Sequence, residues 1–321
     1  MAHLNKVAAL AMTSVMMISA LPATALAAHK SEWVEKDGKW YHYDYEGRKQ
    51  KYTTAYDDST GKCYLLGSKG ARVTGKKGLY SQSYRISNYG DKVKFKTSYY
   101  LKTDGSVLTY SWKKISGKYY YFDYNGRMVK GASASEYDSE KGKRVYYLLG
   151  TDGKRVTKKG WHQVTYKYFD NYSGYVKTSK VWYYVKSDKT LQTGLKKISG
   201  KYYGFREDGS LAQDDYFTTS SGKKYLADKN GVRIKKTGWI TVSRKYSYKY
   251  PSYSHSGTSK YKCYLNKDYT VTEGWKKLSG KWYYFGYGGT MYANTSMSTW
   301  DSETGKSTTY LFNKKGVCIN H

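Results

Sequence analysis

Apolar and polar positions recur in blocks along the chain. The string WKKISGKYYYFDYNGRM starts at Trp112, and close copies start at Leu195 and Trp275. A weaker copy starts at Trp33, so the steps between successive starts are 79, 83 and 80 residues. Self-similarity at a nearly fixed step is typical of repeat proteins, in which each unit buries its apolar face against its neighbours. The pattern therefore favours a repeat protein and leaves almost no chain for a catalytic domain.

Each block predicts two short strands joined by a tight turn. In the copy at 112–128, Ser116-Gly117 separates two runs of aromatic and β-branched residues, and a second turn follows at Asn125-Gly126. Two-residue turns that end in glycine between such runs are strong hairpin signals. The consecutive aromatics from Tyr119 to Phe122 point alternately to opposite faces of a strand. One face can pack on the next hairpin, and the other is available to a ligand.

Two further segments complete each unit of about 80 residues. The second segment, at 137–160, has relatives at 56–78, 217–238 and 300–320. The third is longer and occupies 79–110, 161–193 and 239–273, with tyrosine- and lysine-rich middles at 167–177 and 245–255. These middles are either functional loops or the ends of extended hairpins whose tyrosines pair across strands, and the sequence leaves both open.

The count is three hairpins in each of three units and two more before His321. No segment shows a helical period, and no Pro- or Ser-rich linker interrupts the repeats. The sequence therefore predicts an all-β fold, an elongated solenoid of stacked β-hairpins with no catalytic domain. Its units start near 33, 112, 195 and 275.

The first 27 residues have the composition of a secretory signal peptide. Lys6 precedes an apolar run from Val7 to Leu21, and Ala25-Leu26-Ala27 supplies a small-residue cleavage site. The apolar run is short for a membrane span. We therefore expect residues 28–321 to form the repeat domain of a secreted protein at the cell wall or cell surface, with no transmembrane segment after cleavage.

The formal net charge of +31 predicts an anionic partner. A charge of this size is a statement about partners and solubility, not about the fold. Because the lysine excess runs through every repeat, it favours wall polymers, acidic polysaccharide or another extracellular polyanion over a merely solvated surface.

The sequence contains no pattern that indicates a metal site, a disulfide framework or a set of catalytic residues. We expect Cys63, Cys263 and Cys318 to be unpaired substitutions in strand positions, and Cys318 stands where earlier units have Arg72, Arg155 and Arg233. The Asp57, Asp138 and Asp301 loops are expected to be Asx turns and not calcium loops, because too few carboxylates recur. The histidines are scattered, and no nucleophile stands beside a base. We expect no enzyme, no cofactor and no metal.

The pattern GW-x-x-x-x-G-x-W-Y-Y-F-x-x-x-G-x-M resembles the cell-wall-binding repeats, also called choline-binding repeats, and the related glucan-binding repeats. The resemblance is best from Gly274-Trp275 to Met291 and nearly as good from Trp112 to Met128. It implies stacked β-hairpins on the surface of a Gram-positive bacterium. In the choline-binding branch it implies aromatic cages for a quaternary ammonium, and in the glucan-binding branch aromatics that stack on sugars. Cation attraction by aromatic faces supplies the physical basis for the cages.

The resemblance places the best cages where a third hairpin meets the next first hairpin. One group is Trp161, Trp182 and Tyr183 with Tyr202, and the other is Trp239 and Tyr264 with Trp282 and Tyr283. Trp112, Tyr119, Tyr120 and Trp275 are further candidate ligand-binding residues. For each tryptophan, a purely structural role between hairpins is the alternative.

These features predict non-catalytic binding of a cell-envelope polymer, a teichoic acid or a wall polysaccharide, that anchors the protein at the bacterial surface. Choline is a possible ligand, but incomplete cages and excess positive charge lead us to expect that it is not the principal one. The alternative is an adhesin or matrix protein that contacts a host surface or neighbouring cells. Binding of extracellular nucleic acid, through lysine charge and tyrosine stacking, is a third hypothesis.

Overall fold

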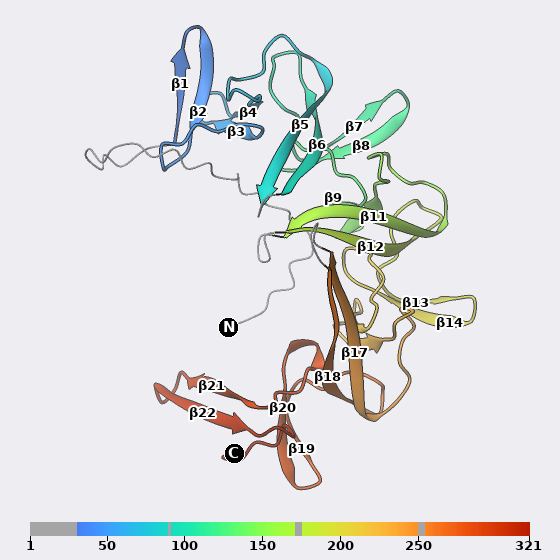
Figure 1. The fold of residues 1–321 in the computed structure, drawn as a ribbon. Helices are drawn as coiled ribbons and strands as arrows, with labels where there is room; N and C mark the ends of the chain where they lie inside the picture. Colours follow the sequence, from blue (N-terminus) through green and yellow to red (C-terminus); the bar gives the residue numbers. More distant parts are fainter. Residues whose placement is uncertain (1–30, 89–90, 171–174, 250–253) are drawn as a thin grey trace. The chain divides into compact units, whose positions relative to one another are not determined.

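The computed structural model describes residues 31–88, 91–170, 175–249 and 254–321 (Figure 1). The expected signal peptide, residues 1–27, lies outside these ranges. Over the described ranges the chain is all-β apart from one short 3₁₀ turn, η1 (Tyr287–Gly289). Within the same ranges no helix is long or apolar enough to cross a membrane.

The strands pair only with their sequence neighbours, which gives eleven antiparallel hairpins in the described part of the chain. The count predicted from the sequence is therefore confirmed. The first-type hairpins are β1 (Glu32–Lys36) with β2 (Lys39–Tyr43), β7 (Ser111–Ile115) with β8 (Lys118–Phe122), β13 (Gly194–Ile198) with β14 (Lys201–Phe205), and β19 (Gly274–Leu278) with β20 (Lys281–Phe285). The second-type hairpins are β3 (Thr54–Asp57) with β4 (Lys62–Leu65), β9 (Ser133–Asp138) with β10 (Lys143–Leu148), β15 (Asp215–Thr218) with β16 (Lys224–Ala227), and β21 (Thr295–Asp301) with β22 (Lys306–Phe312).

The third-type hairpins are the longest: β5 (Gly78–Asn88) with β6 (Asp91–Leu101), β11 (Gly160–Asp170) with β12 (Tyr175–Val185), and β17 (Gly238–Lys249) with β18 (Ser254–Leu265). The register of β5 with β6 is continuous from Gly78↔Leu101 to Asn88↔Asp91. Of the two possibilities left open by the sequence, the extended hairpin is the one observed. Cross-strand pairing of the tyrosines in 167–177 and 245–255 lies outside the described side chains.

The chain divides into two compact units. The first contains the hairpins from β1 to β10, and the second contains those from β13 to β16 and from β19 to β22. Within each unit, the backbone just after one hairpin donates a hydrogen bond to the second strand of the previous hairpin. The amide of Arg155, for example, donates to the carbonyl of Tyr119 at 2.8 Å, and the amide of Cys318 donates to that of Trp282 at 2.8 Å. These bonds stack consecutive hairpins.

Much of the core lies at the ends of the second strands, where the last large apolar side chain turns inward. Phe122, Phe205 and Phe285 are fully buried, as are Leu66 and Leu149 at the equivalent position of second-type hairpins. Each of these residues also forms an isolated bridge six residues further on, as Phe122 does with Met128. The turn that follows each hairpin therefore folds back over its own buried side chain.

The third unit replaces two aromatics of the first-type hairpin and refills the space. Gly204 stands in β14 where β8 has Tyr121, and Leu195 stands in β13 where β7 has Trp112. Phe217, which is 1% exposed, lies over Gly204, and Leu195 packs against the same cluster. A Cβ at Gly204 would lie 2.1 Å from Cδ1 of Phe217. The missing tyrosine is thus replaced by a phenylalanine from the next hairpin.

The cysteines are unpaired, and the Asp57 loop is an Asx turn. All three cysteines are free, as expected. Cys318 does not lie in a strand as predicted; it follows β22 and forms an isolated bridge with Phe312. The Asp57 carboxylate accepts bonds from the amide and hydroxyl of Ser59, which confirms an Asx turn. The described residues contain no group of three or more His, Cys, Asp or Glu side chains placed to hold a metal.

Candidate functional site

Strand alternation turns two side chains in the second strand of a first-type hairpin toward the following hairpin. We call the earlier of these two positions the first aromatic column, and in the four first-type hairpins it holds Trp40, Tyr119, Tyr202 and Trp282. The equivalent residues in hairpins β11–β12 and β17–β18 are Trp182 and Lys262. In β8 the tyrosine opposite Trp112 is Tyr121, and Tyr119 shares its face. The middle residue of the strand points the other way, toward the preceding hairpin. We call the space between two successive hairpins an inter-hairpin cage. One hairpin supplies its tryptophan and the residue of its first aromatic column, and the next hairpin supplies the middle aromatic residue of its second strand.

The Trp161 cage consists of Trp161, Trp182 and Tyr203. Its ring centroids lie 6.4 Å (Trp161–Trp182) and 4.9 Å (Trp161–Tyr203) apart, both nearly perpendicular. Tyr184 at 5.3 Å and Phe205 at 5.7 Å from the Trp161 ring close its inner side. The three cage rings are half-buried, so each keeps an accessible edge or face. Such rings can stack on a sugar or surround an organic cation.

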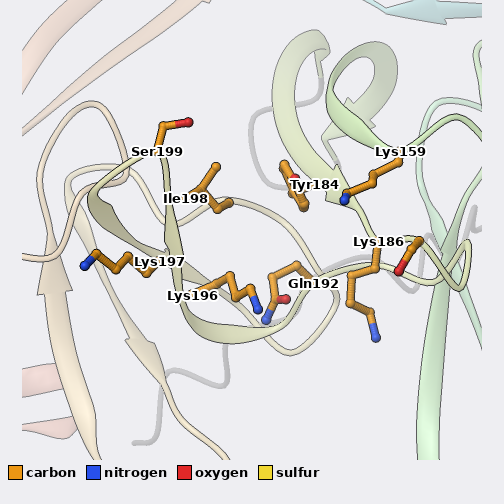
Figure 2. Close-up of a pocket in the computed structure, with 9 residues that line it drawn as sticks. Lys159, Tyr184, Lys186, Gln192, Lys196, Lys197, Ile198 and Ser199 are labelled. Carbon is orange, nitrogen blue, oxygen red and sulfur yellow. The ribbon is translucent and has the colours of Figure 1, made fainter.

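A basic pocket of about 420 Å³ is lined by residues in and beside hairpins β11–β12 and β13–β14 (Figure 2). Tyr184, which contacts Trp161, is part of the lining. Four lysines surround the pocket: Lys159 and Lys186 flank hairpin β11–β12, and Lys196 and Lys197 come from β13. Lys186 also pairs with Asp188 at 3.1 Å. Ammonium groups in the lining of a pocket attract phosphate or carboxylate groups.

The Trp239 cage is built in the same way by β17–β18 and β19–β20. Trp239 lies 5.1 Å from Tyr283 and 5.4 Å from Tyr264, with Phe285 at 5.8 Å. Trp239 is 44% exposed, which makes it the most accessible tryptophan of a cage. The first aromatic column holds Lys262 here in place of an aromatic residue.

Further cages lie where a first-type hairpin meets a second-type hairpin, and in the first of them Trp33 lies 6.0 Å from Tyr64. Trp112 lies 5.3 Å from Tyr147 and 5.1 Å from Tyr121. Burial, with a hydrogen bond to Glu136, raises the pKa of Tyr147 to about 12, so its ring stays neutral. In the last of these cages, Trp275 lies 4.7 Å from Tyr310 and 6.4 Å from Trp282.

The structure brings together part of each predicted group. Trp161 and Trp182 meet, but the tyrosine that enters their cage is Tyr203, and not Tyr202 as grouped from the sequence. Tyr183 is 3% exposed and lies on the opposite face of β12 from its neighbour Trp182.

The second group is divided in the same way. Trp239, Tyr264 and Tyr283 meet, whereas Trp282 belongs to the Trp275 cage. Tyr119 is 44% exposed, and Tyr120 lies on the opposite face of β8 from Trp112.

The middle tyrosines Tyr64, Tyr147, Tyr203 and Tyr310 were not predicted from the sequence. The signal was available: aligning every hairpin on its buried end residue, such as Phe122 or Phe205, puts these tyrosines in one column two residues earlier. His321 was not predicted either, and its ring lies 4.3 Å from that of Trp282 and nearly parallel to it. That contact depends on a non-repeated residue, so no periodicity could find it.

Family comparisons match the first-type hairpins. The description "Choline-binding repeat" matches residues 108–161, and "Putative cell wall binding repeat" matches residues 31–48 and 273–291. These ranges contain hairpins β1–β2, β7–β8 and β19–β20 and the second-type hairpin β9–β10.

Curated relatives include glucosyltransferases of streptococci. Glucosyltransferase-I from Streptococcus downei is 27% identical over 221 residues, which are 66% of this chain and 13% of that protein. Glucosyltransferase-S from Streptococcus mutans serotype c is 26% identical over 186 residues, or 56% of this chain and 10% of that protein. The chain thus spans a small part of the length of these relatives.

Among solved structures, choline binding protein F from Streptococcus pneumoniae is 22% identical, with 91% of this chain and 93% of that chain covered and a TM-score of 0.31. The choline-binding domain of CbpL from the same organism is 27% identical, with 65% of this chain and 100% of that chain covered and a TM-score of 0.23.

Proposed function

The chain contains repeats of the choline-binding and cell-wall-binding family, and from this premise we propose that it is a non-catalytic module that binds a bacterial cell-envelope polymer. The polymer is a teichoic acid or a wall polysaccharide. Binding would hold the protein at the cell wall after secretion. We also propose that the hairpins within each unit stack as a solenoid, because the same backbone bond joins successive hairpins there.

The observation that carries the proposal is the pairing of the Trp161 cage with the lysine pocket on hairpins β11–β12 and β13–β14. The cage offers aromatic faces, and Lys159, Lys186 and Lys196 offer positive charge beside them. A polymer that alternates ring or amine substituents with phosphate or carboxylate groups meets both requirements. A small neutral ligand would use only the cage.

Repetition would turn weak sites into firm attachment. The Trp239 cage repeats the first cage about 80 residues later in the chain, with the Nζ atom of Lys276 5.3 Å from the centre of the Tyr264 ring. Two sites on one chain that engage the same polymer bind with an avidity well above either single affinity. We propose that choline alone is not the principal ligand, because a net charge of +31 repels a free cation.

Sedimentation with purified cell walls, before and after chemical removal of their anionic polymers, tests this function. We expect the intact chain to sediment with untreated walls and to lose most of this binding after stripping. Undiminished binding after stripping would assign the ligand to peptidoglycan or neutral polysaccharide. The absence of binding to both preparations would contradict the proposal and favour an adhesin.

A further inference from the structure

One backbone position is repeated at every junction between a first-type and a second-type hairpin. At this position, which we call the closing position, the amide donates to the carbonyl of the first aromatic column in the preceding hairpin. The four pairs are Arg72 to Trp40 (2.7 Å), Arg155 to Tyr119 (2.8 Å), Arg233 to Tyr202 (2.7 Å) and Cys318 to Trp282 (2.8 Å). Because the backbone is held in the same way, each side chain starts from the same place beside its cage.

The arginines at the closing position place their guanidinium groups inside the aromatic cages. The Cζ atom of Arg72 lies 3.4 Å from the centre of the Tyr64 ring. That of Arg155 lies 3.8 Å from the Tyr147 ring and 5.8 Å from the Trp112 ring. These are distances of cation–π contacts, in which the ring face attracts a cation.

The third cage is looser. Arg233 lies 4.9 Å from the Tyr202 ring and 5.3 Å from the Tyr225 ring, and Leu195 stands there in place of the tryptophan. The same guanidinium therefore meets fewer aromatic faces.

The hydrogen bonding of these arginines also indicates that the rings are their partners. The Nε atoms of all three arginines are buried and make no hydrogen bond to the described residues. A buried donor of a charged group normally finds a hydrogen-bond acceptor. The aromatic faces of the cage replace that acceptor, which makes each guanidinium a resident cation.

The remaining junctions have no arginine at the closing position. Leu211 bonds to Trp182 in the Trp161 cage, and Met291 bonds to Lys262 in the Trp239 cage, each at 2.8 Å. In the described part of the chain, no arginine lies over the Trp161 or the Trp239 ring. At the junction of hairpin β19–β20 with hairpin β21–β22, the residue at the closing position is Cys318. The ring of His321, and not an arginine, enters that cage and lies 4.5 Å from the Trp275 ring.

We propose that Arg72, Arg155 and Arg233 are internal ligands that close three aromatic cages to external organic cations, and that they thereby restrict ligand recognition to the cages without arginine. The inference goes beyond the proposed function, because it concerns the cages that would not bind the polymer. It also specifies the chemical class that is excluded, a quaternary ammonium group, which would need the space of the guanidinium. Replacing the arginine by the residue found at an arginine-free cage should open the site.

The test uses Arg155→Met, which copies Met291, in the full chain with tetramethylammonium as the probe. Trp112→Ala in the Arg155→Met background removes one wall of the new site, and Arg155→Lys keeps a cation at the position. Titration with tetramethylammonium, followed by tryptophan fluorescence, should reveal an added saturable site in Arg155→Met. Its affinity should be at least tenfold higher than that of any wild-type fluorescence change that depends on Trp112. The site should be absent from Arg155→Lys and from the double variant. A folded Arg155→Met that gains no such site would overturn the proposal.

A second measurement does not depend on a variant that folds. In the wild-type protein, NMR of the arginine side chains should show three Nε–H protons shifted upfield by ring currents and protected from exchange. Positions typical of solvated arginines would contradict the proposal. Loss of wall binding would have no effect on either result, so failure of the proposed function is distinguishable from failure of this inference.

Discussion

Gly204 and Phe217 provide the sharpest test of how one hairpin packs on the next. A Cβ added to Gly204 would lie 2.1, 2.2 and 2.6 Å from Cδ1, Cε1 and Cγ of the Phe217 ring. The ring is 1% exposed and stacks on Tyr225 at 5.9 Å. It therefore has to move by more than about 1 Å against a packed cluster, and overpacking of this kind costs about 1–3 kcal/mol. We expect Gly204→Ala to destabilise hairpins β13–β14 and β15–β16 by that amount.

The double variant separates this clash from other effects. Phe217→Ala alone should cost about 3–5 kcal/mol, because it leaves a cavity. In that background Gly204→Ala should be neutral or stabilising, since alanine fills part of the cavity and suits a strand better than glycine. The two changes should therefore couple by at least ~1 kcal/mol. Gly67→Ala is the matched control, because its Cβ would meet only ordinary contacts at 3.6 Å and beyond.

Urea unfolding, combined with hydrogen exchange of the β13–β16 amides, measures these effects. Hydrogen exchange shows which hairpins lose stability, because local unfolding in a repeat protein is confined to neighbouring units. Additive losses, with Gly204→Ala equally harmful with and without the Phe217 ring, would refute the packing argument.

Two further predictions concern hairpin β1–β2 and residues 275–321. Burial lowers the pKa of His42, against the opposing effect of its hydrogen bond to Gln50, so the unfolded chain binds more protons than the folded one. The stability of hairpin β1–β2 should be complete above about pH 6.5 and fall below it, and His42→Tyr should abolish this fall in amide exchange between pH 7.5 and 5.5. Deletion of residues 275–321 should leave the other hairpins folded, since contacts in a stack are local. Complete loss of the β-sheet circular dichroism signal in that truncation would contradict a stacked repeat fold.

The sequence predicted the hairpins well, because their turns carry the information locally. Ser116-Gly117 and its repeats specify the turn, and the aromatics beside them specify the strands, so the number and order of hairpins followed without tertiary data. The extended third-type hairpins were only one of two possibilities, since the residues at their tips are compatible with both.

The composition of each cage was less predictable, because it depends on which strand face meets the next hairpin. Tyr202 and Tyr203 are adjacent, and only the register of β14 against the preceding hairpin decides that Tyr203 enters the Trp161 cage. The repeated arginines were visible as a column. Their position inside the cages required the backbone bonds that place Arg155 beside Tyr119. Similarly, Gly204 stands where the second repeat has Tyr121, and the reason, which is that Phe217 fills this space, is visible only in the structure.

Retention on purified cell walls, measured for Trp182→Ala and Trp40→Ala at low salt and at about 1 M salt, tests the central claim most directly. Both tryptophans occupy the first aromatic column, but Trp182 belongs to a cage without arginine and Trp40 to the junction with Arg72. At about 1 M salt the screening length falls to about 3 Å, so charge attraction is suppressed and the aromatic contribution remains. We expect Trp182→Ala, once shown to be folded, to lose most retention at high salt while low-salt capture stays nearly intact, and Trp40→Ala to behave like the wild type. Equal losses for the two folded variants, or a loss for Trp182→Ala that is the same at both salt concentrations, would contradict the account.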